Sequence, residues 1–320
     1  MKANPVIYVM KSNLGRVFAA VIVIQITALL CRAEAQYASS PATTQTFPVG
    51  TQPWDVAFDG ASIWVVNSGE DTVTKLRASD GAAEGTFATG DFPRAILFDG
   101  VNIWIINSYD STVTKLRASD GALLGTFLDF ISFGDALAYD GTYIWCGSAL
   151  TRSTVSKLLA SDGTYQGFVR TDPIAAALLV AAGKLWVAAA GGNSVESFRL
   201  SDLRKQQTTA VGLAPGGLAF DGRNVWVANG DSDFLSVLRA KDGTVQRTIP
   251  ASGNPAHIIS AAASMWVTQF SSDTASKFRV STGALEATYP VGDGPIGLAF
   301  DGTSIWVANY NDNTVTKVTE

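Results

Sequence analysis

The sequence predicts an all-β protein, a seven-bladed β-propeller of four-stranded antiparallel blades. The first observation is a tryptophan that follows an apolar residue and recurs every 40 or 41 residues. Seven residues form this column: Trp64, Trp104, Trp145, Trp186, Trp226, Trp266 and Trp306. The second observation is the phrase TVTKLRASDGA, which occupies residues 72–82 and again residues 112–122. Self-similarity at a fixed period of this length is typical of repeat architectures.

Each repeat contains four short strand-like segments that are separated by turn residues. In the last repeat, apolar runs at 296–300 and 305–308 flank the Asp301-Gly302 turn, and a β-branched segment follows at 314–318. Earlier repeats add a Ser-Asp-Gly turn and a fourth segment, such as GTFATG from Gly85. Four strands in about forty residues is the size of one propeller blade. No stretch after residue 36 has a helical periodicity.

Two columns of residues are expected to serve structure alone. The Trp side chains should pack in the layers between neighbouring blades, because they are large and apolar and occur once in each repeat. An Asn three residues after the Trp occurs at Asn67, Asn107, Asn229 and Asn309. Asn side chains bond to nearby backbone in turns, so we expect these residues to hold the loop between the second and third strands.

The ends of the repeat region predict how the ring closes. The last repeat stops after its third strand, and residues 44–60 match residues 286–302. We therefore expect residues 44–50 to supply the fourth strand of the last blade. Such pairing removes an exposed sheet edge. The alternative, an open solenoid, would need distinct capping repeats, and none is visible.

The N-terminal 35 residues predict a secretory signal peptide. Lys11 and Arg16 precede an uncharged apolar run at 17–30, and an Ala-Glu-Ala cleavage sequence ends at Ala35. A membrane anchor is the alternative, but the run has about fourteen residues and a span needs roughly twenty. Met10 is an alternative start.

The domain organisation follows from these boundaries. We expect a signal peptide over residues 1–35, a short linker over 36–43 and the propeller over 44–320. The mature protein should be secreted or periplasmic, monomeric and without a stable membrane span. Removal of residues 1–35 takes away four basic residues and one acidic residue, so the net charge changes from −5 to −8. Without a basic stripe, nucleic acid is not expected as a partner.

The repeat sequence also resembles known families. WVANYNDNTVTKV, residues 306–318, resembles the signature of YVTN-type β-propeller repeats. NPAHIIS and PIGLAFDG resemble the Pro-x-Gly opening of the related NHL and streptogramin-lyase-like propellers. The resemblance covers residues 44–320 and implies a propeller. It is not specific for function, because these families include lyases, surface-layer proteins and binding modules.

Residues that would perform catalysis are scarce. His257 is the single histidine, so a Ser/His/Asp triad would have to use it. A zinc site with nitrogen and sulfur ligands would have at most His257 and Cys146, the one cysteine of the mature chain, which we expect to be buried without an intrachain disulfide. Streptogramin lyases use histidines with acidic residues and magnesium at the channel mouth, and that site does not carry over to a chain with one histidine. We therefore predict no catalytic residue, no metal site and no cofactor.

Four polar residues predict a ligand-binding site in an otherwise mostly apolar ring. His257 and Asp55 lie nine residues before the Trp, in a column that elsewhere holds Gly or Ala. Arg94 and Asp135 lie one position earlier in their own repeats. By the resemblance, these positions open the innermost strand near the channel mouth, where the four side chains could converge on a ligand. A water-filled mouth is the alternative.

The absence of a catalytic set favours a non-catalytic binding or scaffold module. Its partner, an unidentified protein, peptide or glycan, should bind at the top face or channel mouth. The alternative is an enzyme of the lyase or esterase type with a site around His257.

Overall fold

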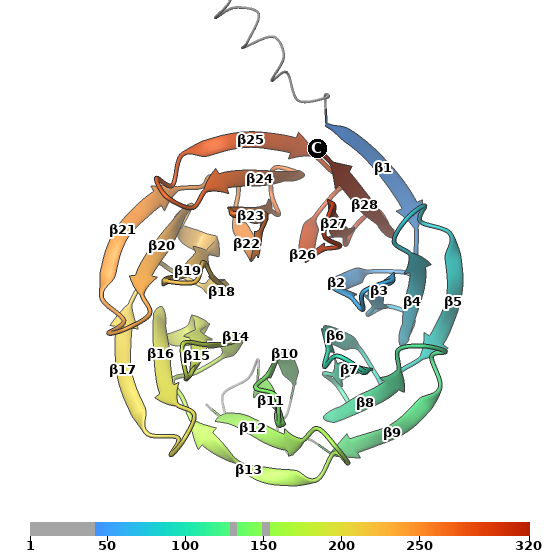
Figure 1. Cartoon of the computed structure of the whole chain (residues 1–320), viewed down its shortest axis with the longest axis horizontal. Coiled ribbons are helices and arrows are strands. Elements are labelled where there is room, and N and C mark those ends of the chain that lie inside the picture. Colours follow the sequence, from blue (N-terminus) through green and yellow to red (C-terminus); the bar gives the residue numbers. More distant parts are fainter. Residues whose placement is uncertain (1–41, 129–132, 149–153) are drawn as a thin grey trace, which may run out of the picture. The chain divides into compact units, whose positions relative to one another are not determined.

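Seven four-stranded antiparallel sheets form a ring around a central channel (Figure 1). The computed structural model describes residues 42–128, 133–148 and 154–320, and residues 43–319 form one compact unit. This arrangement confirms the predicted seven-bladed propeller. The predicted signal peptide and residues 36–41 of the predicted linker lie outside the described residues. No helix in the described part of the chain has the length and apolar character needed to cross a bilayer.

The four strands of each blade follow one another from the channel outward. Blade 1 contains β2 (Pro53–Phe58), β3 (Ser62–Asn67), β4 (Thr72–Arg77) and β5 (Ala83–Ala88); blade 2 contains β6 (Pro93–Phe98), β7 (Asn102–Asn107), β8 (Thr112–Arg117) and β9 (Leu123–Leu128). Blade 3 contains β10 (Gly134–Tyr139), β11 (Tyr143–Ser148), β12 (Thr154–Leu159) and β13 (Tyr165–Arg170). Blade 4 contains β14 (Ala175–Ala181), β15 (Lys184–Ala189), β16 (Ser194–Arg199) and β17 (Lys205–Ala210). Blade 5 contains β18 (Pro215–Phe220), β19 (Asn224–Asn229), β20 (Phe234–Arg239) and β21 (Val245–Pro250). Blade 6 contains β22 (Pro255–Ala261), β23 (Ser264–Gln269), β24 (Thr274–Arg279) and β25 (Leu285–Pro290); blade 7 contains β26 (Pro295–Phe300), β27 (Ser304–Asn309), β28 (Thr314–Thr319) and β1 (Thr43–Pro48). Two short 3-10 turns, η1 (Ala190–Gly192) and η2 (Gly230–Ser232), follow β15 and β19.

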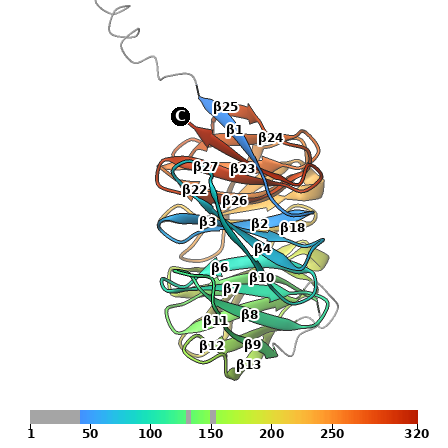
Figure 2. The same cartoon turned by 90° about the vertical axis from the view of Figure 1, so that its right-hand side faces the viewer.

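Each blade twists from the channel outward. In the edge-on view, the innermost strand β2 runs along the channel direction, while β4 and β1 cross the wall obliquely (Figure 2). This is the usual twist of adjacent strands. The first residues of the innermost strands line one cavity, so these strands begin at one face of the ring, which we call the top face, and end at the opposite face.

The ring closes as the sequence predicts. Strand β1 pairs with β28 in antiparallel register from Thr43 opposite Thr319 to Pro48 opposite Thr314. The strand begins one residue before the predicted segment and ends two residues earlier. Phe47 of β1 stacks on Trp306 with ring centres 5.4 Å apart. The fourth strand of blade 7 thus comes from the other end of the repeat region.

The tryptophan column lies between blades. All seven side chains are buried, and each belongs to an apolar cluster with residues of the next blade or of its own outer strands. In five blades the indole N–H donates to the Asp of the preceding Asp-Gly turn, as Trp64 does to Asp59 at 2.7 Å. The same carboxylate accepts the N–H groups of Ala61 and Ser62. These aspartates therefore shape the turn and also hold the Trp.

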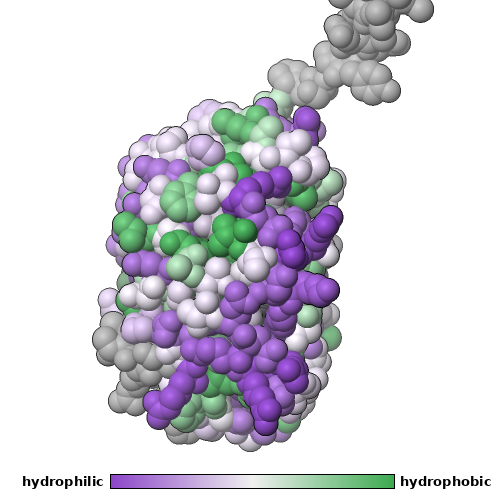
Figure 3. All heavy atoms as spheres, turned by 90° about the vertical axis from the view of Figure 1, so that its left-hand side faces the viewer, coloured by the Kyte–Doolittle hydropathy of each residue, from purple (hydrophilic) through white to green (hydrophobic). Residues whose placement is uncertain are grey.

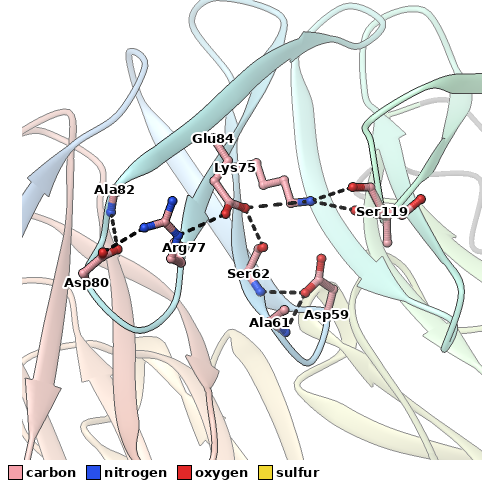
Figure 4. A network of polar contacts seen from close by, with 10 residues as sticks. Asp59, Ala61, Ser62, Lys75, Arg77, Asp80, Ala82, Glu84 and Ser119 are labelled. Carbon is pink, nitrogen blue, oxygen red and sulfur yellow. Dashed lines mark hydrogen bonds and ion pairs between the residues drawn. The ribbon is translucent and has the colours of Figure 1, made fainter.

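The repeated sequence TVTKLRASDGA supplies both the donor and the acceptors of a contact between neighbouring blades, which we call the joint. Lys75 is buried, and its ammonium donates to the carbonyl oxygens of Ala118 and Ser119 in blade 2, at 2.8 and 3.4 Å (Figure 4). Its charge also lies 5.0 Å from the ring centre of Trp64. Lys115 and Lys317 repeat these contacts to the following blades. The Lys of one phrase therefore binds the Ala-Ser of the next, which explains why the phrase is copied.

A substitution at this joint should be costly. Lys115→Met keeps the buried aliphatic stem but removes the donor to two carbonyl oxygens, and we expect the free energy of unfolding to fall by about 1–3 kcal/mol. Denaturant melts measure this loss. Arg117→Met, at a half-exposed side chain two residues away, is the control and should change stability by less than about 0.5 kcal/mol. Equal losses of stability for the two substitutions would show that the Lys115 contact does not stabilise the joint.

The Asn column is structural, but its bonds differ from those expected. The Asn67 amide donates to Thr72 and Thr74 of the third strand, at 3.0 and 2.9 Å. Its oxygen accepts the backbone N–H of Gly50 on the segment that leads into β2. The bond to Thr72 holds the loop between the second and third strands as predicted, but through a Thr side chain rather than the backbone. Asn67, Asn229 and Asn309 also fasten the entry of their own blades to the third strand, whereas the oxygen of Asn107 has no partner among the described residues.

Candidate functional site at the channel mouth

The channel holds a cavity of about 530 Å³ where the innermost strands begin. Its lining includes all four predicted residues: Asp55, Arg94, Asp135 and His257. They come from β2, β6, β10 and β22, so no local segment brings them together. Ring closure does, because every innermost strand starts at the same face. That they gather at one cavity is observed; that they bind a ligand stays a prediction.

Arg94 and Asp135 form an ion pair on the cavity wall. The guanidinium donates to the carboxylate at 2.9 Å, and the two side chains are 23% and 18% exposed. The guanidinium also lies over Trp54, with its carbon 3.9 Å from the ring centre. Trp54 is the tryptophan outside the structural column. A cation held by a carboxylate and an aromatic face is fixed in direction, because both contacts restrict its rotation.

Asp55 and His257 belong to blades 1 and 6, which flank blade 7. The two carboxylate oxygens of Asp55 accept the backbone N–H groups of Val56 at 2.8 Å and Ile96 at 3.2 Å. Asp55 and His257 interact electrostatically. The buried Nδ1 of His257 has no hydrogen-bond partner among the described residues. Among the described residues, no carboxylate bonds to this nitrogen.

Burial perturbs the acidic groups of the cavity. Loss of hydration raises the pKa of Asp55, against the opposing effects of His257 and the two N–H donors. The same loss raises the pKa of Asp135, against the opposing charge of Arg94. In the tryptophan-bound aspartates Asp99 and Asp301, partial burial alone would raise the pKa, but the indole and backbone donors outweigh it and lower the pKa.

These shifts give opposite pH dependences. Asp55 and Asp135 bind a proton more tightly in the folded state, so their contribution to stability is present below the pKa of an unfolded aspartate and is lost as the pH rises through the raised value. Asp99 and Asp301 contribute stability above the unfolded pKa, and it is lost as the pH falls through their lowered values. Carboxyl NMR titration should give Asp55 and Asp135 pKa values above that of an unfolded aspartate, and Asp99 and Asp301 pKa values below it. A common pKa for all four would contradict this.

A row of aromatic side chains includes Trp54, which lines the cavity. Contacts between ring centres run from Tyr310 to Trp54 (5.4 Å), Phe92 (6.5 Å), Tyr109 (4.4 Å) and Phe133 (5.7 Å). We call these five residues the aromatic ridge. Tyr109 and Phe133 are 56% and 38% exposed. Exposed aromatic groups next to a polar cavity are typical of binding surfaces.

The residues of the ridge were not predicted as a site from the sequence. Its members come from blades 7, 1, 2 and 3 and share no motif. One signal was present: the residue before the innermost strand is large and apolar in three successive blades, at Phe92, Phe133 and Ile174. All three have a left-handed backbone, with φ of 55°, 57° and 62°. Such a conformation is unusual for bulky residues, especially β-branched ones, and costs on the order of 1 kcal/mol each.

Small residues face this side of the mouth. At the position of Trp54, Arg94 and Asp135, blades 4 to 6 have Ala176, Gly216 and Ala256, which also line the cavity. Their short side chains leave open the volume that side chains as large as those of blades 1 to 3 would fill. The mouth is thus asymmetric at this position of the innermost strands, which is large in blades 1 to 3 and small in blades 4 to 6, although Asp231, Asn254, His257 and Phe270 also line the cavity on the second side.

Comparisons with known proteins agree with this architecture. No protein-family model matches the chain, and no curated protein matches it. Virginiamycin B lyase from Staphylococcus aureus superposes with a TM-score of 0.75 over 88% of this chain and 100% of that chain, at 15% identity. A streptogramin B lyase superposes with a TM-score of 0.75 over 87% and 97% of the two chains, at 16% identity. Hydrazine synthase of Kuenenia stuttgartiensis gives a TM-score of 0.74 over 85% and 97%, at 15% identity.

The chain has the streptogramin-lyase-like seven-bladed propeller fold. At these identities the likeness shows the fold alone, and one fold carries many activities. In this lyase-like propeller, the described residues contain no group of three or more His, Cys, Asp or Glu side chains placed to hold a metal ion. Its activity has to be argued from the channel mouth itself.

Proposed function

We propose that the protein is an exported binding module that holds its ligand at the channel mouth. The observation that carries this proposal is the joint presence of the polar cavity and the aromatic ridge on one face. Apolar and aromatic walls with a few convergent polar groups are the general form of a ligand site. Trp, Tyr and Arg are also the residues that contribute most to binding at protein interfaces. The ligand is a protein, peptide or glycan segment that lies on the ridge and enters the cavity.

The backbone of the ridge supports this proposal. Phe92 and Phe133 place large side chains at positions where blades 6 and 7 have Asn254 and Gly294. These smaller residues adopt the left-handed conformation more readily. Phe92 and Phe133 pack on Tyr109, but Phe133 is still 38% exposed, so part of the surface of these costly aromatic residues is open to a ligand.

Export is part of the proposal and rests on residues 1–35 alone. The basic N-terminal part, the short apolar run and the Ala-x-Ala sequence are the three features of a cleaved signal. N-terminal sequencing of the protein from its native host tests it. A first residue of Gln36 is expected, and a mature chain that still begins at Met1 or Met10 would contradict export by cleavage.

Binding should depend on the ridge. Tyr109→Ala combined with Phe133→Ser should weaken binding to a peptide or glycan selected on arrays by at least about tenfold. The matched control is Leu123→Ala combined with Leu285→Ser, which alters apolar residues of outer strands that are at least as exposed as the two ridge residues. Equal binding by the ridge variant and the wild type, or equal loss in the control, would reject the ridge as the binding surface.

An enzyme of the lyase or esterase type remains the alternative, because His257 interacts with Asp55 in the same cavity. His257→Ala separates the two functions. A binding module should retain its fold and its ligand with less than about a tenfold loss of affinity, since the ridge supplies most of the contact. An enzyme that uses His257 should lose nearly all turnover.

A further inference from the structure

The joint between blades 5 and 6 carries its cation on a different strand. In blade 1, Lys75 of β4 lies opposite Gly85 of β5. In blade 5, Val237 of β20 lies opposite Arg247 of β21. In blade 5 the cation therefore lies on the fourth strand, and the residue of the third strand opposite Trp226 is Val237.

Arg247 preserves the contacts of the missing lysine. Its guanidinium donates to the carbonyl oxygens of Val280 at 2.7 Å and Ser281 at 3.0 Å in blade 6. It also lies 5.4 Å from the ring centre of Trp226. The joint is therefore maintained from the outer strand, and the long side chain that would extend from position 237 is absent.

A hollow of about 480 Å³ lies at this joint. It is lined by Asp221, Arg223, Asn224, Val237, Arg239, Gln246, Arg247, Val280 and Ser281. Strand β18 begins at the channel mouth and ends at Phe220 beside this hollow, so the hollow lies at the opposite face from the proposed ligand site. It is a separate feature of the molecule.

Positive charge dominates the lining. Three arginines contribute, and Asp221 is the one carboxylate among the lining residues described. Asp221 is already engaged, because its oxygens accept the indole N–H of Trp226 at 2.8 Å and the backbone N–H groups of Arg223 and Asn224. Its charge is therefore turned toward the protein.

The arginines retain donors for a ligand. Arg239 pairs with Asp242 at 3.1 Å and with Gln246 at 3.0 Å, both at exposed or half-exposed positions. The guanidinium of Arg223 is exposed, and it has no hydrogen bond or ion pair with any described residue. Figure 3 looks onto the side of the ring that carries β17 and β21, where hydrophilic residues form a continuous band. Arg223, Arg239 and Gln246 of the hollow's lining are exposed to solvent.

We propose that this hollow binds a tetrahedral oxyanion, a phosphate or sulfate group. Arginine presents several N–H donors in a planar fork that matches such oxygens, and two or three guanidinium groups can share one group. The predicted mature chain has a net charge of −8, so the protein as a whole repels anions. Binding would therefore be local to this cluster rather than a general attraction.

The test is titration calorimetry with inorganic phosphate and with inorganic sulfate at constant ionic strength. Arg223→Gln combined with Arg239→Gln should weaken binding by at least about tenfold. The control is Arg77→Gln combined with Arg117→Gln, which removes two charges from blades 1 and 2, where Lys75 and Lys115 occupy the joint. The control should change affinity by less than about twofold. No binding to the wild type, or equal weakening in the control, would overturn the proposal.

A second variant tests the origin of the hollow. Val237→Lys combined with Arg247→Gly restores the arrangement of blade 1 and should fill the hollow and abolish oxyanion binding. If this variant does not fold, the comparison of the Arg223→Gln and Arg239→Gln double variant with its control still tests the proposal. Vesicles with and without phosphatidylglycerol, and an oligosaccharide with and without sulfate, identify the source. Arginine-dependent binding to either supports the proposal and names a headgroup or a glycan sulfate. Binding of inorganic oxyanion alone supports a free ligand.

Discussion

Deletion of residues 36–50 is expected to destabilise the whole ring. Residues 43–48 form β1, so the deletion removes every backbone pair with β28 and the stack of Phe47 on Trp306. Phe47 also covers Gly81 of blade 1, where an added Cβ would lie 2.1 Å from its ring. Burial of one Phe contributes about 1.5–3 kcal/mol and each strand hydrogen bond about 0.5–1.5 kcal/mol. We therefore expect the melting temperature to fall by on the order of 10 °C.

The deletion should also cause aggregation. Without β1, the outer edge of β28 exposes unpaired N–H and C=O groups that can pair with another chain. Thermal melts together with light scattering measure both effects. Deletion of residues 36–42 alone leaves β1 intact and should be nearly silent. Equal melting temperatures for the mature chain and the 36–50 deletion would show that β1 does not close the ring.

Trp226→Ala should be the most destabilising single substitution of those considered. Trp226 is fully buried within a cluster that includes Ile258, Met265 and Val267 of blade 6. Emptying a large aromatic site costs about 3–5 kcal/mol. The substitution also removes the donor to Asp221, at 2.8 Å, and leaves that carboxylate with backbone partners and Asn224 alone. Denaturant melts should show a loss in this range.

Two further variants separate the contributions. Trp226→Phe keeps most of the apolar volume but loses the bond to Asp221, and it should cost less than the alanine variant. Trp54→Ala is the control, since Trp54 is partly exposed at the channel mouth. A loss below about 1 kcal/mol for Trp226→Ala would mean that the column does not pack between blades.

The sequence determined the architecture because each blade is specified by local repetition. One Trp and one third strand recur at 40 or 41 residues, with an Asp-Gly turn before the Trp in five of the seven blades, and each blade must bury both faces against its neighbours. The match of residues 44–60 to residues 286–302 then decides where the ring closes. The four polar residues of the channel mouth could be named for the same reason, since departures from a repeated column are visible in the sequence.

Tertiary structure alone decided which residues meet across blades. The aromatic ridge joins Tyr310 to Trp54, residues that are far apart in the chain and adjacent only because β1 closes the ring. The Lys75 joint depends on carbonyl groups of Ala118 and Ser119, and a sequence pattern does not show where backbone oxygens point. The hollow beside Val237 depends on which strand carries the cation. Sequence repetition specifies what each blade repeats, whereas contacts between unlike blades depend on side-chain geometry that only the closed ring defines.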